Sequence, residues 1–453
     1  MPGKTHTLDT NRLETTIKAH MQKTEVPALA ISISQGWDVI YAKGFGKTGK
    51  DVAAEDVSEK TVFPLLSTNK PLTGSLIMCL VEQGHLNLDI PVIQYAPWLE
   101  YPPGGDIRRV TLRHLLSMCS GLSSDPQPTP EQRVKSHPDP VETHIREDLP
   151  TYSVIALPGD VFWYSNPGIN LAGYIAQHVL GQSYTGLMQE YILDPLEMHY
   201  TTFDPIVAVA YSAALPHERD EHNRLRAKAD FPILTPVSTV TDLANFAIMQ
   251  MNGGQFKGRN LLKEETIAEM HRIHADAYTT RFRYYGLTFD IEQYKGLKIV
   301  SHGGGGDGFG STFIMAPEPS IAISILFNQP GGYSFPAFSI FDELLHLPAD
   351  EEKTPTDPDR TKWVSYVGEY ENPSNLECYD EKVGIYIENS QLLLSSKSKS
   401  VPLVPVEEHV YQTSDGEVSV GFVPPKAGVK NTQYIMLNRY DIGLVSAVPC
   451  RRI

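Results

Sequence analysis

A serine and a lysine three residues apart stand at the head of an amphipathic segment. Ser67 and Lys70 follow the apolar residues 62–66, and residues 71–83 then carry apolar side chains at helical spacing. Positions three apart share one face of a helix, so the two side chains can meet. Helix amides stabilise negative charge on a serine oxygen at this end, and a lysine amine can assist loss of the hydroxyl proton. The pair therefore predicts an activated nucleophile.

The same residues also have a purely structural interpretation. Serine and threonine are preferred N-cap residues, so Ser67 or Thr68 could simply begin the helix, with Pro71 tolerated in the first turn. The spacing is also common by chance, because Ser396 and Lys399 repeat it inside a polar run. We interpret that second match as a solvated strand end or loop. The local pattern alone does not decide between catalysis and capping.

A tyrosine and an asparagine form a second candidate pair. Tyr164 and Asn166 precede Pro167 and an apolar helical pattern. The structural interpretation is that Asn166 is the N-cap and Pro167 the first helical residue. The functional interpretation is that the Tyr164 phenol lies beside a lysine and acts as general base toward Ser67, while Asn166 donates to a substrate carbonyl. The same tripeptide pattern recurs at residues 370–372, so it is weak on its own.

A run of four glycines follows His302. The segment contains a literal Gly-x-Gly-x-x-Gly, but a strand pattern comes next instead of the helix that a nucleotide phosphate requires, so we reject nucleotide binding. Glycines on a strand edge let a ligand approach the backbone closely. A backbone N–H there could complete an oxyanion hole with the N–H of Ser67. The alternative is a flexible hairpin loop.

No pattern predicts a metal or a cofactor. In residues 217–222 the second histidine comes one position too late for the helical His-Glu-x-x-His motif, which favours a solvated polar loop. The cysteines are scattered, which predicts free, mostly buried thiols in a reducing compartment and argues against structural zinc. They are Cys79, Cys119, Cys378 and Cys450.

Charge and hydropathy exclude several classes of partner. The 453 residues carry a net charge of −16, which disfavours nucleic acid or an anionic membrane surface as the main partner. No window approaches the ~18 apolar residues of a membrane span, and the polar residues 1–12 show no signal peptide. We therefore expect a cytoplasmic protein without a membrane span. The oligomeric state is not predicted.

Strand patterns near both ends of the first 347 residues flank a helical middle. This order predicts an α+β fold, with one sheet built from both ends of that region and a helical subdomain inserted. The predicted helices are 11–20, 72–83, 111–118, 169–179, 184–192, 241–252 and 338–345. The predicted strands are 28–34, 39–42, 285–291, 297–301, 311–316 and 321–327.

A change of composition suggests a second domain. Residues 348–360 are acidic and contain proline, as linkers do. Short alternating strand patterns follow, with a turn at residues 389–390, which predicts a small antiparallel barrel or sandwich. The predicted organisation is a catalytic domain over residues 1–347, a linker over 348–360 and a barrel domain over 361–453.

Taken in order, the three motifs resemble those of the serine β-lactamase and penicillin-binding protein superfamily. The similarity is greatest to its class C-like branch, which includes type VIII carboxylesterases, D-aminopeptidases and transesterases. The resemblance covers roughly residues 10–346 and includes residues 86–92, 110–117, 120–122, 194–198 and 237–243. It implies the β-lactamase-like antiparallel sheet with a helical subdomain. The C-terminal part resembles the lipocalin-like barrels of some members.

The resemblance implies catalytic roles for four residues. Ser67 would attack the acyl carbon and become acylated, and Lys70 and Tyr164 would share the proton handling. The backbone N–H groups of Ser67 and Gly305 would hold the oxyanion. The glycine run leaves the second donor uncertain by one position, and Leu66 stands where a small residue is expected.

The resemblance also implies a substrate-binding set of Asn166, His302, Gly303 and Gly304. Histidine replaces the lysine of the β-lactamase version of the third motif, which weakens recognition of a carboxylate at neutral pH. A neutral or esterified small molecule or short peptide is therefore favoured over a β-lactam. The expected function is a cofactor-free serine hydrolase of ester or amide bonds. The alternatives are an acyltransferase using the same acyl-enzyme, and a non-catalytic protein whose barrel holds an apolar ligand.

Overall fold

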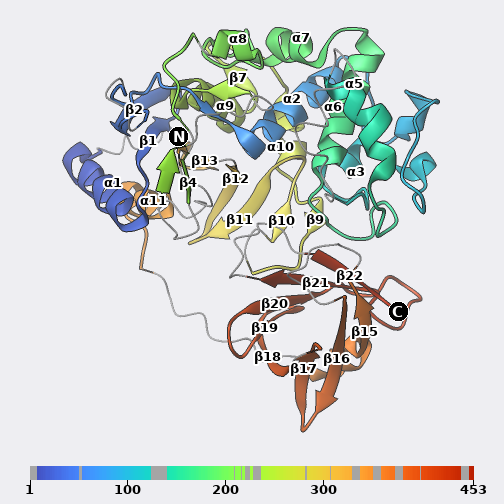
Figure 1. Ribbon diagram of the computed structural model, residues 1–453. Coiled ribbons are helices and arrows are strands. Elements are labelled where there is room, and N and C mark those ends of the chain that lie inside the picture. Colours follow the sequence, from blue (N-terminus) through green and yellow to red (C-terminus); the bar gives the residue numbers. More distant parts are fainter. Residues whose placement is uncertain are drawn as a thin grey trace. The chain divides into compact units, whose positions relative to one another are not determined.

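The computed structural model divides into two compact units. Figure 1 shows its helices and strands, coloured along the sequence. The first unit consists of Met1–Gln83, Thr185–His271 and Ile291–Asp350, and the second of Gly84–Tyr184, Arg272–Asp290 and Glu351–Ile453. The structure describes residues 8–49, 54–123, 140–208, 210–215, 217–219, 225–227, 236–280, 283–306, 308–328, 337–349, 359–372, 381–397, 399–439 and 448–453.

An antiparallel sheet forms the centre of the first unit, with strands in the order β2-β1-β14-β13-β12-β11. Antiparallel pairing joins β1 to β2 and β14, and β13 to β12 and β14. The strands are β1 (Ala28–Gln35), β2 (Asp38–Gly46), β11 (Asp290–Tyr294), β12 (Leu297–Gly306), β13 (Phe309–Ala316) and β14 (Ile321–Phe327). Every residue of β14 is buried, as expected for a strand covered on both faces.

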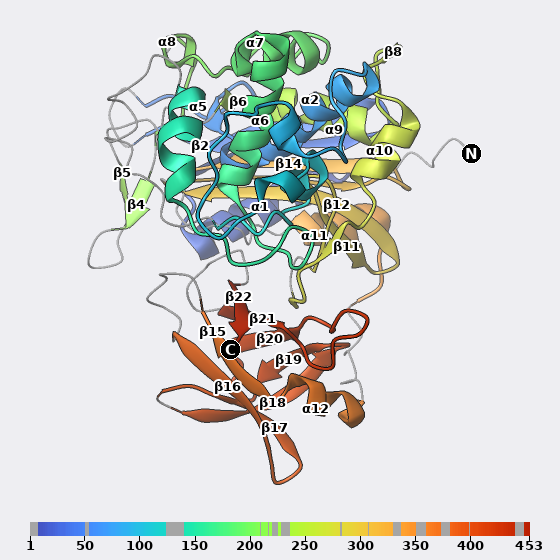
Figure 2. The same ribbon diagram turned by 90° about the vertical axis from the view of Figure 1, so that its right-hand side faces the viewer.

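Helices cover both faces of this sheet. Leu29, Ile31 and Ile33 alternate along β1 and join one apolar core with α1 (Thr10–Thr24) and α11 (Ala337–Leu345). Ser32 points to the other face, where its hydroxyl donates to the Val240 carbonyl at 2.8 Å. Val240 begins α9 (Val240–Met251). Figures 1 and 2 accordingly show α9 on one side of the strands and α1 with α11 on the other.

Helix α2 (Lys70–Glu82) is anchored to α9 by a buried chain of hydrogen bonds. Gln250 Nε2 donates to Ser75 Oγ at 2.9 Å, and Ser75 Oγ donates to the Pro71 carbonyl at 2.8 Å. Gln250 Oε1 lies 3.0 Å from His271 Nε2. Burial lowers the pKa of His271 to about 3, so the ring is neutral and its Nε2–H can donate. This network fixes α2 with respect to the sheet that α9 covers.

Short elements complete the first unit. Strand β3 (Phe63–Pro64) pairs with β6 (Val237–Ser238) just before the 3₁₀ turn η1 (Leu66–Asn69). The others are α7 (Tyr184–Met188), the π-helical turn η6 (Gln189–Leu193), α8 (Pro205–Ala208), β4 (His217–Arg219), β5 (Leu225–Ala227), β7 (Gln255–Phe256), β8 (Arg259–Asn260) and α10 (Glu264–Met270).

The second unit contains helices and a closed barrel. Its longest helix, α6 (Asn166–Leu180), has the apolar positions that the sequence predicts. Strands β15–β22 close in sequential order. They are β15 (Gly368–Glu371), β16 (Lys382–Glu388), β17 (Gln391–Ser395), β18 (Ser400–Glu407), β19 (Val410–Thr413), β20 (Val418–Phe422), β21 (Tyr434–Arg439) and β22 (Val448–Arg452). Further elements are η2 (Val92–Gln94), η3 (Ile107–Arg109), α3 (Leu112–Leu116), α5 (Pro140–Thr143), η4 (His144–Asp148), η5 (Leu149–Thr151), β9 (Ala275–Asp276), β10 (Tyr284–Tyr285), η7 (Arg360–Lys362) and α12 (Trp363–Tyr366).

The barrel has an apolar core made by its own side chains. Trp363, Tyr370 and Phe422 belong to one buried cluster with residues from successive strands. Figure 2 shows the ribbon of these strands. A barrel of this size has an interior just wide enough for side chains to fill. Asn389 and Ser390 have φ of 50° and 63°, as a tight hairpin turn requires. The sheet, the helical segments and the closed barrel confirm the predicted α+β fold with a C-terminal barrel.

Two local predictions and one alternative interpretation are wrong. Residues 285–291 do not form one strand, because β10 ends at Tyr285 and β11 begins at Asp290. Thr288 adopts φ of 68° between them, and its N–H donates to the Leu116 carbonyl at 2.9 Å, which breaks the strand. The alternative of a flexible loop for the glycines after His302 is also wrong, because residues 303–306 form part of β12. The polar segment from His217 begins as strand β4.

Some predictions fall on parts of the chain that the structure does not describe. Residues 350–358 of the predicted linker, residues 220–222 of the histidine segment and Cys378 lie outside the described residues. Cys79, Cys119 and Cys450 are free and buried, as predicted. Within the described residues, no helix is both long enough and apolar enough to cross a membrane.

Candidate active site

Ser67 and Lys70 meet at the start of α2. Ser67 lies in the turn η1, and Lys70 is the first residue of α2. The Lys70 Nζ donates to the Ser67 Oγ at 2.8 Å. The capping interpretation is wrong, because the N-cap of α2 is Asn69 and no side chain caps this helix. The serine hydroxyl is therefore bonded to a side chain that could take its proton.

Burial makes Lys70 a base at neutral pH. Its side chain is 7% exposed, and loss of water lowers the pKa of the ammonium to about 7. Desolvation disfavours the charged form of a lysine, so a large share of the molecules carry a neutral amine near pH 7. A neutral amine can accept a proton from the hydroxyl that it contacts.

The rate of ester cleavage is expected to rise with pH through about 7. Below that value Lys70 holds a proton and cannot act as base; above it the amine is neutral, so kcat/KM should climb and then level off. The measurement is kcat/KM for a p-nitrophenyl ester between pH 5 and 9, after subtraction of spontaneous hydrolysis. A profile that stays flat between pH 6 and 8 would contradict the assignment of Lys70 as base.

The residue before the nucleophile has a strained backbone. Leu66 adopts φ of 50°, in the left-handed region that a leucine rarely occupies. Such conformations cost about 1 to 3 kcal/mol and persist only where the surrounding structure holds them. The Leu65 N–H donates to the Pro236 carbonyl at 2.9 Å, which fixes one side of this turn. Ser67 therefore lies in a sharp turn between β3 and α2.

Strand β12 brings the glycine run against this bend. Gly304 pairs with Ser311 of β13, and Gly303 and Gly305 pair with Thr312 and Gly310. A Cβ added at Gly304 would come within 2.7 Å of both the Ser67 nitrogen and the Leu65 oxygen. Since real Cβ atoms do not approach so closely, only glycine fits here. The backbone of β12 thus borders the Ser67 N–H directly.

His302 is neutral in this site. Its Nδ1 lies 2.7 Å from the Gly303 carbonyl, which can only accept, so Nδ1 carries the proton. Burial, together with the nearby Lys70 charge, lowers the pKa of the imidazole to about 3. A ring that stays neutral down to that pH provides no positive charge for a substrate carboxylate.

Tyr164 and Asn166 lie in the second unit, at the start of α6. Ser165 is the N-cap of this helix, because its Oγ accepts from the Gly168 N–H at 3.2 Å. The interpretation of Asn166 as the cap is therefore wrong, and Asn166 is instead the first helical residue. Tyr164 is half-buried and lies close enough to Tyr285 to help raise the pKa of that phenol. That Tyr164 meets Lys70 stays a prediction of the sequence.

The chance repeats of the motifs lie in the barrel. Ser396 and Lys399 fall between β17 and β18, and the Lys399 ammonium pairs with Asp415 and Glu417 at 2.8 and 2.9 Å. This confirms the interpretation of that segment as a solvated strand end. The 370–372 repeat begins in β15. The 396–399 repeat precedes β18 and not a long helix, unlike Ser67.

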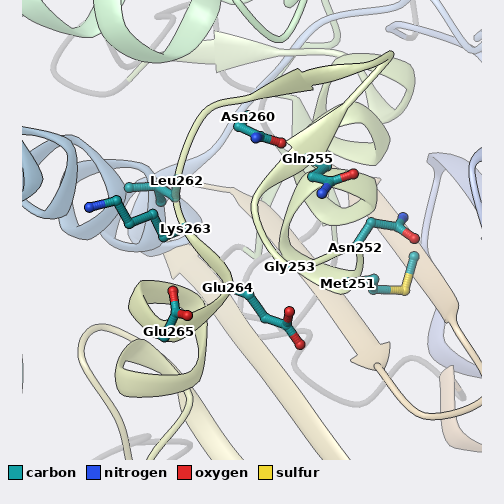
Figure 3. A pocket seen from close by; sticks show the side chains of 9 residues that line it. All are labelled: Met251, Asn252, Gly253, Gln255, Asn260, Leu262, Lys263, Glu264 and Glu265. Carbon is teal, nitrogen blue, oxygen red and sulfur yellow. The ribbon is translucent and has the colours of Figure 1, made fainter.

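A separate hollow occurs elsewhere in the first unit. Figure 3 shows a cavity of about 420 Å³ between the end of α9, the β7–β8 hairpin and the start of α10. Its polar lining includes Gln255, Asn260, Lys263 and Glu264. None of the motif residues contributes to it. Within the described residues, no group of three histidine, cysteine or acidic side chains could hold a metal ion.

Sequence reasoning missed two side chains next to the nucleophile. Thr68 and Ser311 both contact the Leu65 carbonyl, just before the strained Leu66. Thr68 could have been suspected as part of the Ser-x-x-Lys motif. Ser311 has no local signal, because only the register of β13 against β12 brings it there.

This chain is similar to a family model and to known proteins. A family model described as Beta-lactamase matches residues 13–340. Protein flp of Staphylococcus aureus (strain MW2) is 26% identical over 333 residues, which cover 71% of this chain and only 64% of that protein. The chain therefore spans less than two thirds of the length of this relative.

Solved structures also resemble the chain. The octameric penicillin-binding protein homologue from Pyrococcus abyssi has a TM-score of 0.65 at 25% identity, and the match covers 98% of this chain and 100% of that one. EstCE1, described as a hydrolase with promiscuous acyltransferase activity, has a TM-score of 0.60 at 20% identity over 70% of this chain and 93% of its own. At that identity the second match shows the fold alone.

Proposed function

Because this chain belongs to the β-lactamase family, we propose that it is a serine hydrolase that cleaves ester or amide bonds through an acyl-enzyme on Ser67. Family membership supports the hydrolase class but not the bond or the substrate, since one fold serves many reactions. The observation that carries the proposal is the 2.8 Å contact between the Ser67 hydroxyl and the buried amine of Lys70. A nucleophile bonded to a base is the arrangement that covalent catalysis requires.

In the proposed reaction the neutral amine of Lys70, helped by Tyr164, accepts the hydroxyl proton of Ser67. The Ser67 Oγ bonds to the substrate carbonyl carbon, and the carbonyl oxygen becomes an oxyanion held by the N–H groups of Ser67 and Gly305. The carbon–oxygen or carbon–nitrogen bond to the leaving group then breaks. The leaving group takes a proton from the Lys70 and Tyr164 pair. Water repeats these steps on the ester of Ser67 and releases the acid.

We propose a substrate whose acyl side is neutral. His302 stays uncharged because burial lowers its pKa to about 3. Together with Asn166 it would position the substrate by hydrogen bonds, and Gly303 and Gly304 would let the substrate lie against β12. A small ester, an amide or a short peptide without a carboxylate at this point fits such a site better than a charged β-lactam.

Acyl transfer is the second candidate function. It uses the same ester on Ser67, and only the acceptor differs, because an alcohol or amine replaces water in the second half of the reaction. The similarity to EstCE1 makes this worth testing, although that match supports the fold alone. The non-catalytic alternative is weakened by the apolar side chains that pack the barrel interior.

Covalent labelling tests the proposal. The wild-type protein is incubated with a fluorophosphonate, which reacts with activated serines, and its intact mass is measured before and after. We expect one adduct on the wild type and none on Ser67→Ala. If the wild type gains no mass while a known serine hydrolase in the same buffer does, the protein is a binding protein and not this enzyme. Product analysis with an added alcohol then separates hydrolysis from acyl transfer.

A further inference from the structure

Three groups meet at the carbonyl of Leu65, two residues before the nucleophile. The Ser311 Oγ donates to this carbonyl at 2.5 Å, and the Thr68 Oγ1 contacts the same oxygen. The Thr68 N–H also donates to it, at 3.1 Å. The two hydroxyls contact each other. Leu65 and Thr68 have no exposed surface and Ser311 is 1% exposed, so water does not compete for these bonds.

The register of the sheet brings Ser311 to this place. Ser311 lies opposite Gly304, and a Cβ at Gly304 would stand 2.5 Å from the Ser311 Oγ. Because Gly304 has no Cβ, the Ser311 hydroxyl has space beside it. A residue from β13, more than 240 positions away in sequence, reaches the turn before Ser67 through this gap.

Proton counting shows that the two hydroxyls act as a unit. Each carries one proton, while the Leu65 carbonyl has two lone pairs and already accepts the Thr68 N–H. Ser311 donates to the carbonyl, and Thr68 donates either to the carbonyl or to the Ser311 oxygen. Removal of either hydroxyl leaves the other without one of its contacts. Because all three groups are buried, an unmade bond here is costly.

This arrangement lies next to the one strained residue of the turn. Leu66, with φ of 50°, follows the bonded carbonyl of Leu65 directly and precedes Ser67. Rotation of the Leu65–Leu66 peptide would relieve that conformation, but it would turn the Leu65 carbonyl away from both hydroxyls. The same rotation would move the Ser67 nitrogen, which borders Gly304. The direction of the Ser67 side chain and of its N–H therefore depends on whether this carbonyl is held.

We propose that Thr68 and Ser311 form a hydroxyl latch on the Leu65 carbonyl, which holds the left-handed turn at Leu66 and so aims the Ser67 hydroxyl and N–H at the substrate. Both are positioning residues, since they act through Ser67 and touch no reacting atom. The proposal rests on the function proposed above. It explains why the motif residue Thr68, which does not cap α2, has its side chain directed toward the sheet.

The test compares variants that remove or keep each hydroxyl. Ser311→Ala and Thr68→Val delete one hydroxyl each at nearly constant volume, while Thr68→Ser keeps the hydroxyl and loses a methyl. The matched control is Ser324→Ala on β14, because Ser324 is equally buried and its Oγ has no hydrogen-bond partner among the described residues. The readouts are the rate constant for fluorophosphonate labelling, kcat and KM for a p-nitrophenyl ester, and the melting temperature.

We expect Ser311→Ala and Thr68→Val to lower the labelling rate constant and kcat by ~10- to 100-fold, because a small misplacement of a reacting group has effects of this size. KM should change little. Thr68→Ser and Ser324→Ala should retain most of the wild-type rate. The double variant should be no slower than the slower single variant, because the two hydroxyls act together.

Two results would overturn the latch. One is a labelling rate for folded Ser311→Ala and Thr68→Val equal to that of the wild type, with only the melting temperature lowered. The other is an equal loss in Thr68→Ser and Thr68→Val, which would show that the site responds to any change of packing at this position and not to loss of the hydroxyl in particular. If Ser311→Ala does not fold, the comparison of Thr68→Val with Thr68→Ser tests the latch alone. If the wild type is not labelled at all, the result contradicts the proposed function and not the latch in particular.

Discussion

Replacement of Lys70 by methionine is expected to lower kcat/KM for a p-nitrophenyl ester by ~10²-fold or more. Methionine is one atom shorter but fills most of the buried space of the lysine, so the loss of activity reports mainly the missing amine. The Lys70 Nζ is 2.8 Å from the Ser67 hydroxyl and its pKa is lowered to about 7. Without this amine the Ser67 hydroxyl loses its bonded base. The rise of kcat/KM with pH near 7 should then disappear, together with most of kcat/KM itself.

A matched control is available on β12. Lys298 is also partly buried, and burial lowers its pKa too, but it belongs to none of the motifs. Lys298→Met should leave kcat/KM near the wild-type value. Steady-state kinetics of the two variants, with melting temperatures measured in parallel, separate loss of the base from loss of a buried charge. Equal activity of Lys70→Met and Lys298→Met would refute the role assigned to Lys70.

Gly304→Ala is expected to lower kcat by ~10²-fold or more, although the change adds a single methyl group. That methyl would meet the Ser311 Oγ at 2.5 Å and the Leu65 oxygen and Ser67 nitrogen at 2.7 Å. Two of these neighbours are backbone atoms of the nucleophile turn, so relief requires the turn itself to move. The measurement is kcat and the labelling rate constant on protein shown to be folded by circular dichroism.

General destabilisation by a glycine substitution has to be separated from this effect. Gly258 has φ of 77° in the β7–β8 hairpin, with no atom within 4 Å of an added Cβ. Gly258→Ala should therefore lower the melting temperature through backbone strain and leave kcat unchanged. A Gly304→Ala variant with wild-type kcat would show that β12 does not restrict the position of Ser67.

The meeting of Ser67 and Lys70 could be predicted because it is local. Two residues three positions apart at a helix start are brought together by helical geometry alone. The same holds for α1, α6 and α9, whose apolar spacing lies within each segment, although the cap of α6 is Ser165 and not the predicted Asn166. In all these cases the signal and the structure share a short stretch of chain.

The surroundings of Ser67 could not be predicted, because they depend on pairing between distant strands. Glycine is a poor strand former, so the run after His302 resembles a loop until β13 pairs with it. No pattern in the sequence marks the left-handed conformation of Leu66 or places Ser311 beside it. The break within residues 285–291 likewise comes from a bond between Thr288 and the distant Leu116.

The central claim is that Ser67 is the residue that becomes acylated. The most direct measurement is peptide mass spectrometry of the fluorophosphonate-treated wild type, which locates the adduct in the chain. The proposed function predicts a single modified peptide that contains Ser67, with no modified peptide from Ser67→Ala. An adduct found on any other residue, or one that persists in Ser67→Ala, would contradict it.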